Sequence, residues 1–208
     1  MDVPKELGRR ERKKQATRDA LVDAALALFE ARGVDATTIE DITDRVDVSS
    51  RTFHRYFACK EDVLFADSAE RGERFAAALA GRPGDEPLLD SLRAAACELA
   101  SMLVEQPERE FRRLQLIEGA YSLHGRHLRA SEEWADAVAD YCASRLAMRV
   151  DDALPTLLAS CTSAAIRTAR RCWSRDPSLD LVREVERCFG LLGRLREVTV
   201  PRAGARPR

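Results

Sequence analysis

The sequence has no long apolar run: its most extended ones are only a few residues, such as AALAL at 24–28. A helix that spans a bilayer needs roughly 20 predominantly apolar residues, so we expect no transmembrane segment. The charged start, MDVPKELGRRERKK, also lacks the apolar stretch of a secretory signal. These two absences predict a cytoplasmic protein.

Clustered metal ligands and catalytic motifs are missing as well. The six cysteines (Cys59, Cys97, Cys142, Cys161, Cys172 and Cys188) form no CxxC pair and no Cys/His cluster at zinc-finger spacing, which in a cytoplasmic chain favours reduced thiols. His124 and His127 are three residues apart, but no third ligand stands at a recognisable spacing. No glycine-rich phosphate loop or nucleophile motif occurs. We therefore predict no catalytic residue, metal site or cofactor, and an all-helical enzyme is a remote alternative.

The alternating apolar pattern of a β-strand is absent, whereas apolar residues recur at helical spacing. With 45% hydrophobic and 33% charged residues, the chain of 208 residues suits one or two compact domains. Two rows spaced by four residues share one helical face over residues 14–31, and Gly33 ends this helix. The rows are Ala16, Ala20, Ala24, Leu28 and Leu21, Ala25, Phe29.

Two short amphipathic helices are expected next. Thr37 or Thr38 can cap the first, whose apolar face is Ile39, Ile42 and Val46. Asp47 breaks it. Ser49 or Ser50 can cap the second, over 49–57, with Val48, Phe53 and Phe57 pointing inward. Two short helices joined by a turn of about three residues, and braced by the helix before them, predict a helix-turn-helix.

The rest of the chain is expected to be helical over 60–80, 87–105, 108–122, 130–149, 152–175 and 178–197. The predicted fold class is all-α, with an N-terminal three-helix helix-turn-helix domain, a C-terminal helical bundle and about nine helices. We predict a flexible arm at 1–8, a helix-turn-helix domain at 9–60, a C-terminal helical domain at 61–200, and a disordered tail at 201–208.

Positive charge is concentrated in the first 60 residues, although the formal net charge of the chain is −1. Residues 5–18 hold seven lysines and arginines against two glutamates, and residues 48–60 contain Arg51, Arg55 and Lys60 with no acid. Such basic islands are the footprint of a surface that faces phosphate. Duplex DNA requires cations for its backbone and donors for its base edges, and the segment DVSSRTFHRYF at 47–57 offers both.

The stretch TRDALVDAALALFEARGVDATTIEDITDRVDVSSRTFHRYFACKEDVLFAD resembles TetR-type transcriptional regulators from about residue 10 to 67. The resemblance implies a homodimeric repressor or, less often, an activator. It implies that the third helix lies in the major groove of a palindromic operator and that the C-terminal bundle encloses a small effector. The expected partners are double-stranded DNA, a second copy of the chain and an unidentified hydrophobic or amphiphilic small molecule.

Roles at the predicted DNA interface follow from residue type. We expect phosphate contacts from hydroxyls and an ammonium at Thr38, Thr52, Tyr56 and Lys60. Ser49, Ser50, Arg51 and His54 start or face the groove side of the third helix, opposite Phe53 and Phe57, and Arg55 suits either bases or phosphates. A basic arm that includes Arg10, Lys13 and Lys14 is expected along the DNA backbone or in its minor groove. Tyr56 closing the bundle, and a merely solvated arm, are the structural alternatives.

Two positions depart from the family pattern. A glycine usually stands at the position of Asp47, where the chain tends toward left-handed φ and ψ, a region that Asp tolerates better than most residues. His54 replaces the usual tyrosine or phenylalanine, which puts in doubt a direct transfer of the contact made there.

The C-terminal bundle supplies two further sets of candidates. An apolar effector pocket is predicted from Phe75, Leu99, Leu103, Phe111, Leu114, Ile117, Tyr121, Trp134, Val138 and Tyr141, with the basic stretch HGRHLRA at 124–130 either at its mouth or simply solvated. A dimer interface is predicted from Leu158, Cys161, Ala165, Ala169, Leu181, Val185, Phe189 and Leu192. An ordinary intramolecular core is the alternative explanation for either set. A thiol-based redox sensor that pairs Cys161 or Cys172 across a dimer is an alternative regulator.

Overall fold

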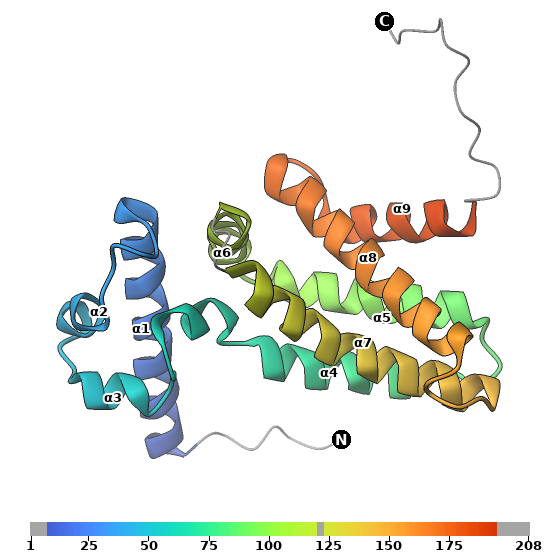
Figure 1. The fold of residues 1–208 in the computed structure, drawn as a ribbon, viewed down its shortest axis with the longest axis horizontal. Helices are drawn as coiled ribbons and strands as arrows, with labels where there is room; N and C mark the ends of the chain where they lie inside the picture. The colour runs from blue at the N-terminus through green and yellow to red at the C-terminus, as the bar shows by residue number, and fades with distance from the viewer. Residues whose placement is uncertain (1–7, 120–122, 195–208) are drawn as a thin grey trace, which may run out of the picture. The chain divides into compact units, whose positions relative to one another are not determined.

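The computed structural model of the protein describes residues 8–119 and 123–194, and within these ranges it is all-α, as predicted (Figure 1). The described chain contains no strand. None of its helices is long and apolar enough to cross a membrane. In chain order the elements are α1 (Arg9–Arg32), α2 (Ile39–Val46), α3 (Ser50–His54), the 3-10 helix η1 (Lys60–Phe65), α4 (Ser68–Ala80), α5 (Leu88–Leu103), α6 (Pro107–Gly119), α7 (His124–Leu146), α8 (Ala153–Arg175) and α9 (Leu181–Gly193).

Several boundaries differ from the prediction. The helix expected over 60–80 is divided into η1 and α4; the tighter 3-10 turn buries the adjacent side chains Val63 and Leu64 together. The expected break at His124 and Gly125 is instead the start of α7. The first helix begins at Arg9, five residues earlier than expected.

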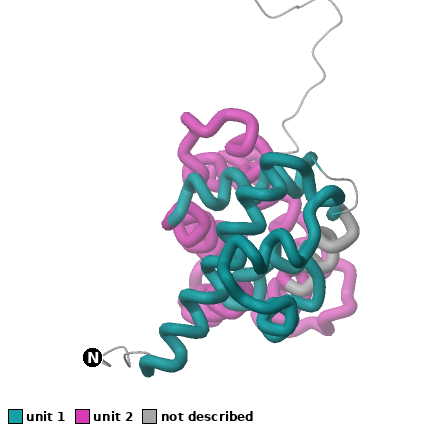
Figure 2. The backbone as a smooth tube through the Cα atoms, turned by 90° about the vertical axis from the view of Figure 1, so that its left-hand side faces the viewer, with its two compact units in different colours: residues 1–70, 106–130 teal, residues 71–105, 131–208 magenta. Residues whose placement is uncertain are grey.

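The chain divides into two compact units, which are interleaved in sequence (Figure 2). Unit 1 contains residues up to 70 and 106–130, and unit 2 contains 71–105 and residues from 131 onward. The segment 106–130 therefore packs with the N-terminal helices, although it follows α4 and α5. The boundary predicted near residue 60 separates two functions and not two compact units, so it stays a prediction.

Unit 1 is built around one face of α1. This face supplies Leu21, Val22, Ala25, Leu26 and Phe29 to a cluster that also contains Ile42, Phe53, Phe57, Val63, Leu64, Ile117 and Leu123. Phe53 is 0% exposed and Phe57 is 4% exposed, and their ring centroids lie 5.5 Å apart. The prediction that both phenylalanines point inward is confirmed.

Arginines of α6 connect that helix to the rest of unit 1. Arg109 pairs with Asp23 at 3.2 Å, and Arg112 pairs with Glu30 at 3.4 Å, both on α1. Arg113 forms an ion pair with the buried Glu110 and donates to the backbone carbonyl of Leu64 at 2.9 Å. Since a buried carboxylate requires a charged or hydrogen-bonding partner, Glu110 and Arg113 hold α6 against η1 as a pair.

In unit 2, α9 packs against α5 and α8. Its inward face carries Leu181, Val185, Cys188 and Phe189, all buried. The side chain of Asp180 caps α9 by accepting from the backbone N–H of Arg183 at 3.1 Å, which satisfies one of the unpaired donors of the first turn.

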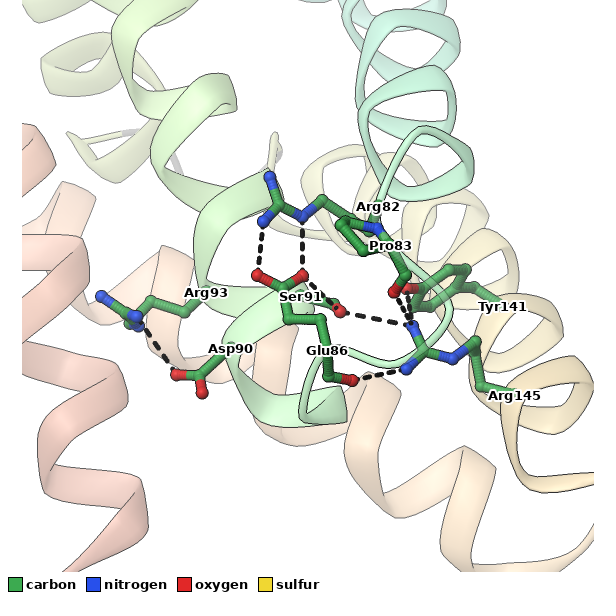
Figure 3. Close-up of polar contacts among 8 residues, drawn as sticks. All are labelled: Arg82, Pro83, Glu86, Asp90, Ser91, Arg93, Tyr141 and Arg145. Atoms are coloured by element: carbon green, nitrogen blue, oxygen red, sulfur yellow. Dashed lines mark hydrogen bonds and ion pairs between the residues drawn. The ribbon is translucent and has the colours of Figure 1, made fainter.

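A polar cluster fixes the connection between α4 and α5 to α7 within unit 2 (Figure 3). The guanidinium of Arg145 donates to the Tyr141 hydroxyl at 2.6 Å and to the carbonyls of Pro83 at 3.2 Å and Glu86 at 2.5 Å. The Glu86 carboxylate accepts from Arg82 at 2.8 Å and from the buried hydroxyl of Ser91 at 2.8 Å. The hydrogen bond from Arg82, followed by that from Ser91, lowers the pKa of Glu86 from 4.5 to about 2.

This lowered pKa predicts an acid-dependent loss of stability. Because Glu86 binds its proton more weakly in the folded chain, its stabilising contribution is complete above about pH 4.5 and is lost as the pH falls toward about 2. We expect the free energy of unfolding of Glu86→Gln to depend less steeply on pH across that window than that of the wild type, as measured by urea unfolding at each pH. Asp85→Asn is the neighbouring control, and an equal flattening by both variants would contradict the assignment.

Candidate nucleic-acid interface

The start of α2 is fixed by a reciprocal cap. The Thr38 hydroxyl accepts from the backbone N–H of Asp41 at 3.1 Å, and the Asp41 carboxylate accepts from the backbone N–H of Thr38 at 2.8 Å. Arg32 pairs with the same carboxylate at 3.0 Å. The backbone N–H of Thr38, followed by its hydroxyl, holds the pKa of Asp41 below its ordinary value. The cap predicted at Thr37 or Thr38 is thus at Thr38.

The turn between α2 and α3 depends on Asp47, which adopts the left-handed conformation with φ 55° and ψ 51°. The backbone N–H of the next residue, Val48, donates to the carbonyl of Thr43 at 3.1 Å and so closes the end of α2. The left-handed conformation predicted at Asp47 is confirmed, and the turn forms without glycine.

Helix α3 is shorter than predicted, although its chain remains coiled beyond His54. Ser49 caps it by accepting from the backbone N–H of Thr52 at 3.2 Å. After His54, the backbone N–H groups of Tyr56 and Phe57 both donate to the carbonyl of Phe53, at 2.9 and 3.0 Å. The segment from 49 to 57 therefore keeps the two faces expected of it.

Those two faces differ sharply in exposure. The outward face presents Arg51, His54 and Arg55, which are exposed, while Ser50, Thr52 and Tyr56 are half-buried at its margins. Phe53 and Phe57 anchor the opposite face in the core of unit 1. A single short element thus offers a guanidinium, an imidazole and hydroxyls on a firmly packed base, which is the arrangement that a duplex groove accepts.

Two predicted phosphate donors already have intramolecular partners. The Thr38 hydroxyl donates to the Asp41 carboxylate at 2.7 Å. The Lys60 ammonium donates to the backbone carbonyls of Thr37 at 2.7 Å and Asp35 at 3.2 Å. Lys60 therefore ties η1 to the loop that precedes α2, and two of its three N–H donors are occupied.

The basic N-terminal segment is helical where the structure describes it. Arg10, Lys13 and Lys14 lie in the first turns of α1 and are exposed, so these three residues of the predicted basic arm belong to a helix. Lys14 pairs with Glu11 at 3.1 Å, an i, i+3 contact that supports the early start of the helix. Residues 1–7, which complete the predicted arm, lie outside the described part.

The predicted effector residues are divided between the two units. In unit 2, Phe75, Leu99, Leu103 and Val138 are buried, while Trp134 and Tyr141 are half-buried; in unit 1, Leu114 and Ile117 are buried and Phe111 is half-buried. Tyr121, and the side chains of the basic stretch 124–130, lie outside the described part. Tyr141 belongs to the Arg145 cluster, and Ile117 belongs to the core around α1. The pocket itself stays a prediction.

Most of the predicted dimer residues point into their own protomer. Ala165, Ala169, Leu181, Val185 and Phe189 are buried within unit 2, whereas Leu158, Cys161 and Leu192 are half-buried. The first five therefore form the intramolecular core, the alternative that apolar seams leave open. The outward face of the same helices carries Leu154, Leu157 and Leu191, which are exposed. These three leucines are not among the predicted dimer residues, because their spacing resembles that of the buried row.

The surroundings of the cysteines favour neither reactive thiols nor a metal site. Burial raises the pKa of the thiols of Cys59, Cys97 and Cys188, and raises that of Cys142 to about 11. At neutral pH these four thiols remain protonated, and thiols are poor nucleophiles. Among the residues that the structure describes, no group of three or more His, Cys, Asp or Glu side chains is arranged to hold a metal ion.

Known proteins are similar to this chain over most of its length. A family model described as bacterial regulatory proteins, tetR family, matches residues 21–66, and one described as MftR C-terminal domain matches residues 86–196. The HTH-type transcriptional regulator TcmR of Streptomyces glaucescens is 34% identical over 187 residues, which cover 86% of this chain and 82% of that protein.

Solved structures share the fold at lower identity. The complex of SmeT, a Stenotrophomonas maltophilia repressor, with triclosan has a TM-score of 0.64 and 21% identity and covers 93% of this chain and 99% of its own. Thermus thermophilus FadR with lauroyl-CoA has a TM-score of 0.56 and 24% identity, with 92% and 100% covered. The two family matches and the identity to TcmR show that the chain belongs to the TetR family of bacterial regulatory proteins, which are DNA-binding transcriptional regulators and not enzymes.

Proposed function

We propose that this regulator is a repressor that binds a palindromic operator as a homodimer and leaves it when a small hydrophobic or amphiphilic effector binds. The observation that carries the proposal is the division of residues 49–57 into a buried phenylalanine face and an exposed face of donors. A buried face fixes the orientation of the short helix, so its exposed donors can be presented to base edges without a large ordering cost.

Arg51 and His54 are the proposed base contacts. Both are exposed on α3, and an arginine can donate two hydrogen bonds to the O6 and N7 acceptors of guanine. Ser49, Ser50, Thr52 and Tyr56 lie at the margins of this face and are proposed to set its register against the backbone. A homodimer would present the face twice, which requires a two-fold symmetric site.

The proposed dimer surface is the outward face of α8 and α9. On α8, Leu154, Leu157, Leu158 and Cys161 follow at i, i+3, i+4 and i+7 and so share one face; on α9, Leu191 is exposed and Leu192 is half-buried. Leu157 is 58% exposed in the protomer. A row of exposed leucines is typical of a surface that a partner covers. In the proposed interface, this row takes the place of the five predicted residues that are buried in the protomer.

The proposed effector class is apolar or acyl-bearing. Of the predicted lining residues, Phe75, Leu99, Leu103, Trp134 and Val138 belong to unit 2, and the ring centroids of Phe75 and Trp134 lie 6.3 Å apart. SmeT is described in complex with triclosan, and FadR with lauroyl-CoA. Thermal-shift screening with fatty acyl thioesters and halogenated aromatics tests this part of the proposal.

The redox-sensing alternative depends on Cys161 and Cys172, since the other four thiols have raised pKa values. The two are half-buried on α8 and lie eleven positions apart, about 16 Å along a helix, so they can bridge only across a dimer. An oxidant that changes neither the affinity for DNA nor the mobility of the protein on a non-reducing gel excludes this alternative.

Selection of bound sequences from random duplexes tests the main proposal directly. Purified protein should enrich a two-fold symmetric consensus with half-sites about one helical turn apart. Enrichment of an asymmetric site, or of no sequence at all, would exclude the proposed mode of binding.

Replacement of the base contacts should relax the sequence preference of the regulator. Arg51→Ala is expected to cost about 1–3 kcal/mol on the selected operator and far less on unrelated DNA, because the lost hydrogen bonds are specific to one base. His54→Ala should relax a different position of the consensus. Repeating the selection with each variant measures this, and an unchanged consensus for both would rule out α3 as the recognition element.

Replacement of Lys60 should act mainly on the stability of the fold and not through a lost contact with DNA. Lys60→Met keeps most of the methylene stem but removes the hydrogen bonds to Asp35 and Thr37, and hydrogen bonds to a charged group contribute roughly 1.5–3 kcal/mol. We expect a lower free energy of unfolding in the absence of DNA, measured by urea denaturation, with Lys13→Met as a control. If unfolding is unchanged and the salt dependence of DNA binding becomes shallower, Lys60 is a direct phosphate contact and not a positioning residue.

A charge at the centre of the exposed α8 face should separate the subunits. Leu157→Glu places like charges against each other across the two-fold axis, whereas the exposed side chain contributes little to the stability of one protomer. Sedimentation equilibrium should report a mass near 23.2 kDa for the variant and twice that for the wild type. Leu89→Glu changes a comparably exposed leucine on α5 and should remain dimeric; if Leu157→Glu also remains dimeric, the interface lies elsewhere.

A further inference from the structure

We propose that a cleft between the first turns of α1 and the end of the α3 segment binds one backbone phosphate of duplex DNA, and that Arg55 serves this phosphate and not the bases. The inference rests on the proposed function, and it assigns a role to Arg55 that residue type alone leaves open. Within unit 1 the cleft has a volume of about 630 Å³ and is lined by Arg10, Glu11, Lys13, Lys14, Thr17, Arg55 and Tyr56.

The α1 wall of the cleft is a single helical face. Arg10, Lys13, Lys14 and Thr17 follow at i, i+3, i+4 and i+7, a spacing that places their side chains above one another. The Thr17 hydroxyl donates to the carbonyl of Lys13 at 2.9 Å, so its proton is already used within α1. The cations therefore stand on a helix whose later turns pack in the core of unit 1, so the backbone that carries them is already ordered before DNA binds.

The opposite wall is a stacked pair of side chains. The guanidinium carbon of Arg55 lies 5.0 Å from the centroid of the Tyr56 ring, and an Arg55 Nη donates to the Tyr56 hydroxyl at 3.0 Å. Stacking on a tyrosine restrains a planar guanidinium while its remaining N–H groups stay available, and such a fork matches the oxygens of a phosphate. Because Tyr56 lines the cleft too, this restraint holds Arg55 beside the α1 cations.

The charge of the cleft is strongly positive and only partly neutralised. Four cationic side chains face one carboxylate, Glu11, whose partner is Lys14. The side chains of this pair are 51% and 58% exposed, so the ion pair is weak and readily exchanged for a stronger anion. Arg10 and Lys13 have no ion-pair partner among the described residues of unit 1. Together these groups select for an anion with several acceptor oxygens, of which a phosphodiester is the one that the operator supplies.

The test compares Arg55→Ala with the wild type on the duplex selected by the wild type, with titrations at several salt concentrations. We expect an affinity loss on the order of tenfold and a salt dependence that is shallower by about 0.9 in the logarithmic slope, the value for one phosphate contact. The selected consensus should be unchanged. Arg55 is exposed, so the thermal unfolding of the variant should match that of the wild type and separate loss of contact from loss of fold.

Phosphate ethylation of the selected duplex identifies the contact itself. One ethylated phosphate per half-site should weaken binding of the wild type more than binding of Arg55→Ala, because the variant has already lost one of the cations that contact it. A titration with inorganic phosphate, followed by NMR, distinguishes the operator backbone from a free anion. Saturation at millimolar phosphate with no ethylation-sensitive site in DNA would assign the cleft to a free anion and overturn the proposal.

Arg9 and Arg10 provide a matched control within one helix. Arg10 lines the cleft and Arg9 does not, so Arg10→Ala should weaken binding clearly more than Arg9→Ala. Equal losses would indicate a diffuse basic surface and would contradict a built site. If Arg55→Ala changes the base preference but leaves the salt dependence unchanged, Arg55 contacts the bases and not a phosphate. If the wild type selects no duplex at all, it is the proposed function that fails.

Removal of the opposing acid should have the reverse effect. Glu11→Gln leaves the cleft with four cations and no carboxylate, so we expect tighter binding and a steeper dependence on salt. Weaker binding by Glu11→Gln would contradict the proposed polarity of the cleft.

Discussion

The burial of Phe53 and Phe57 against α1 is the interaction on which the proposed DNA surface depends. Helix α3 is only five residues long, and so short a helix has little stability of its own because nucleation consumes most of what its hydrogen bonds contribute. Two aromatic side chains inserted into the core of unit 1 hold it instead. Because Arg51 and His54 lie away from the two phenylalanines on the helix, the same insertion leaves them exposed.

Around these two phenylalanines, many polar side chains are already used in intramolecular hydrogen bonds. Only the remaining ones are free to contact a ligand. The hydroxyl of Thr38 is committed to Asp41, that of Ser49 to a helix cap, and the ammonium of Lys60 to two backbone carbonyls. These are the small and cationic residues that a list of DNA contacts would include first. Unit 1 therefore divides its polar side chains between those that shape the helix-turn-helix and those that extend from it, chiefly Arg10, Lys13, Arg51 and His54.

What could be predicted from the sequence depended on local chemistry. The caps at Thr38 and Ser49, the left-handed Asp47 and the inward phenylalanines follow from hydrogen-bonding capacity and helical period, and all four are present. The break between η1 and α4 did not follow, because Val63 and Leu64 suit an α-helix equally well until their common burial selects the tighter turn. Which apolar residues of α8 and α9 stay uncovered in the protomer did not follow from the sequence either. On α8, Leu154, Leu157 and Leu158 follow a helical spacing much like that of Ala165 and Ala169, and only the packing of α9 determines which row is covered.

The cleft could not be predicted from the sequence for a different reason. It joins residues that are some forty positions apart in the chain. A helical wheel of α1 groups Arg10, Lys13, Lys14 and Thr17, yet nothing in that segment indicates that Arg55 and Tyr56 form the facing wall. That juxtaposition comes from the packing of the α3 segment on α1. It also reconciles a formal net charge of −1 with a partner as acidic as DNA, because attraction to a phosphate falls off within about 10 Å at moderate ionic strength. Over that distance the four cations of the cleft, and not the charge of the whole chain, set the potential that the phosphate experiences.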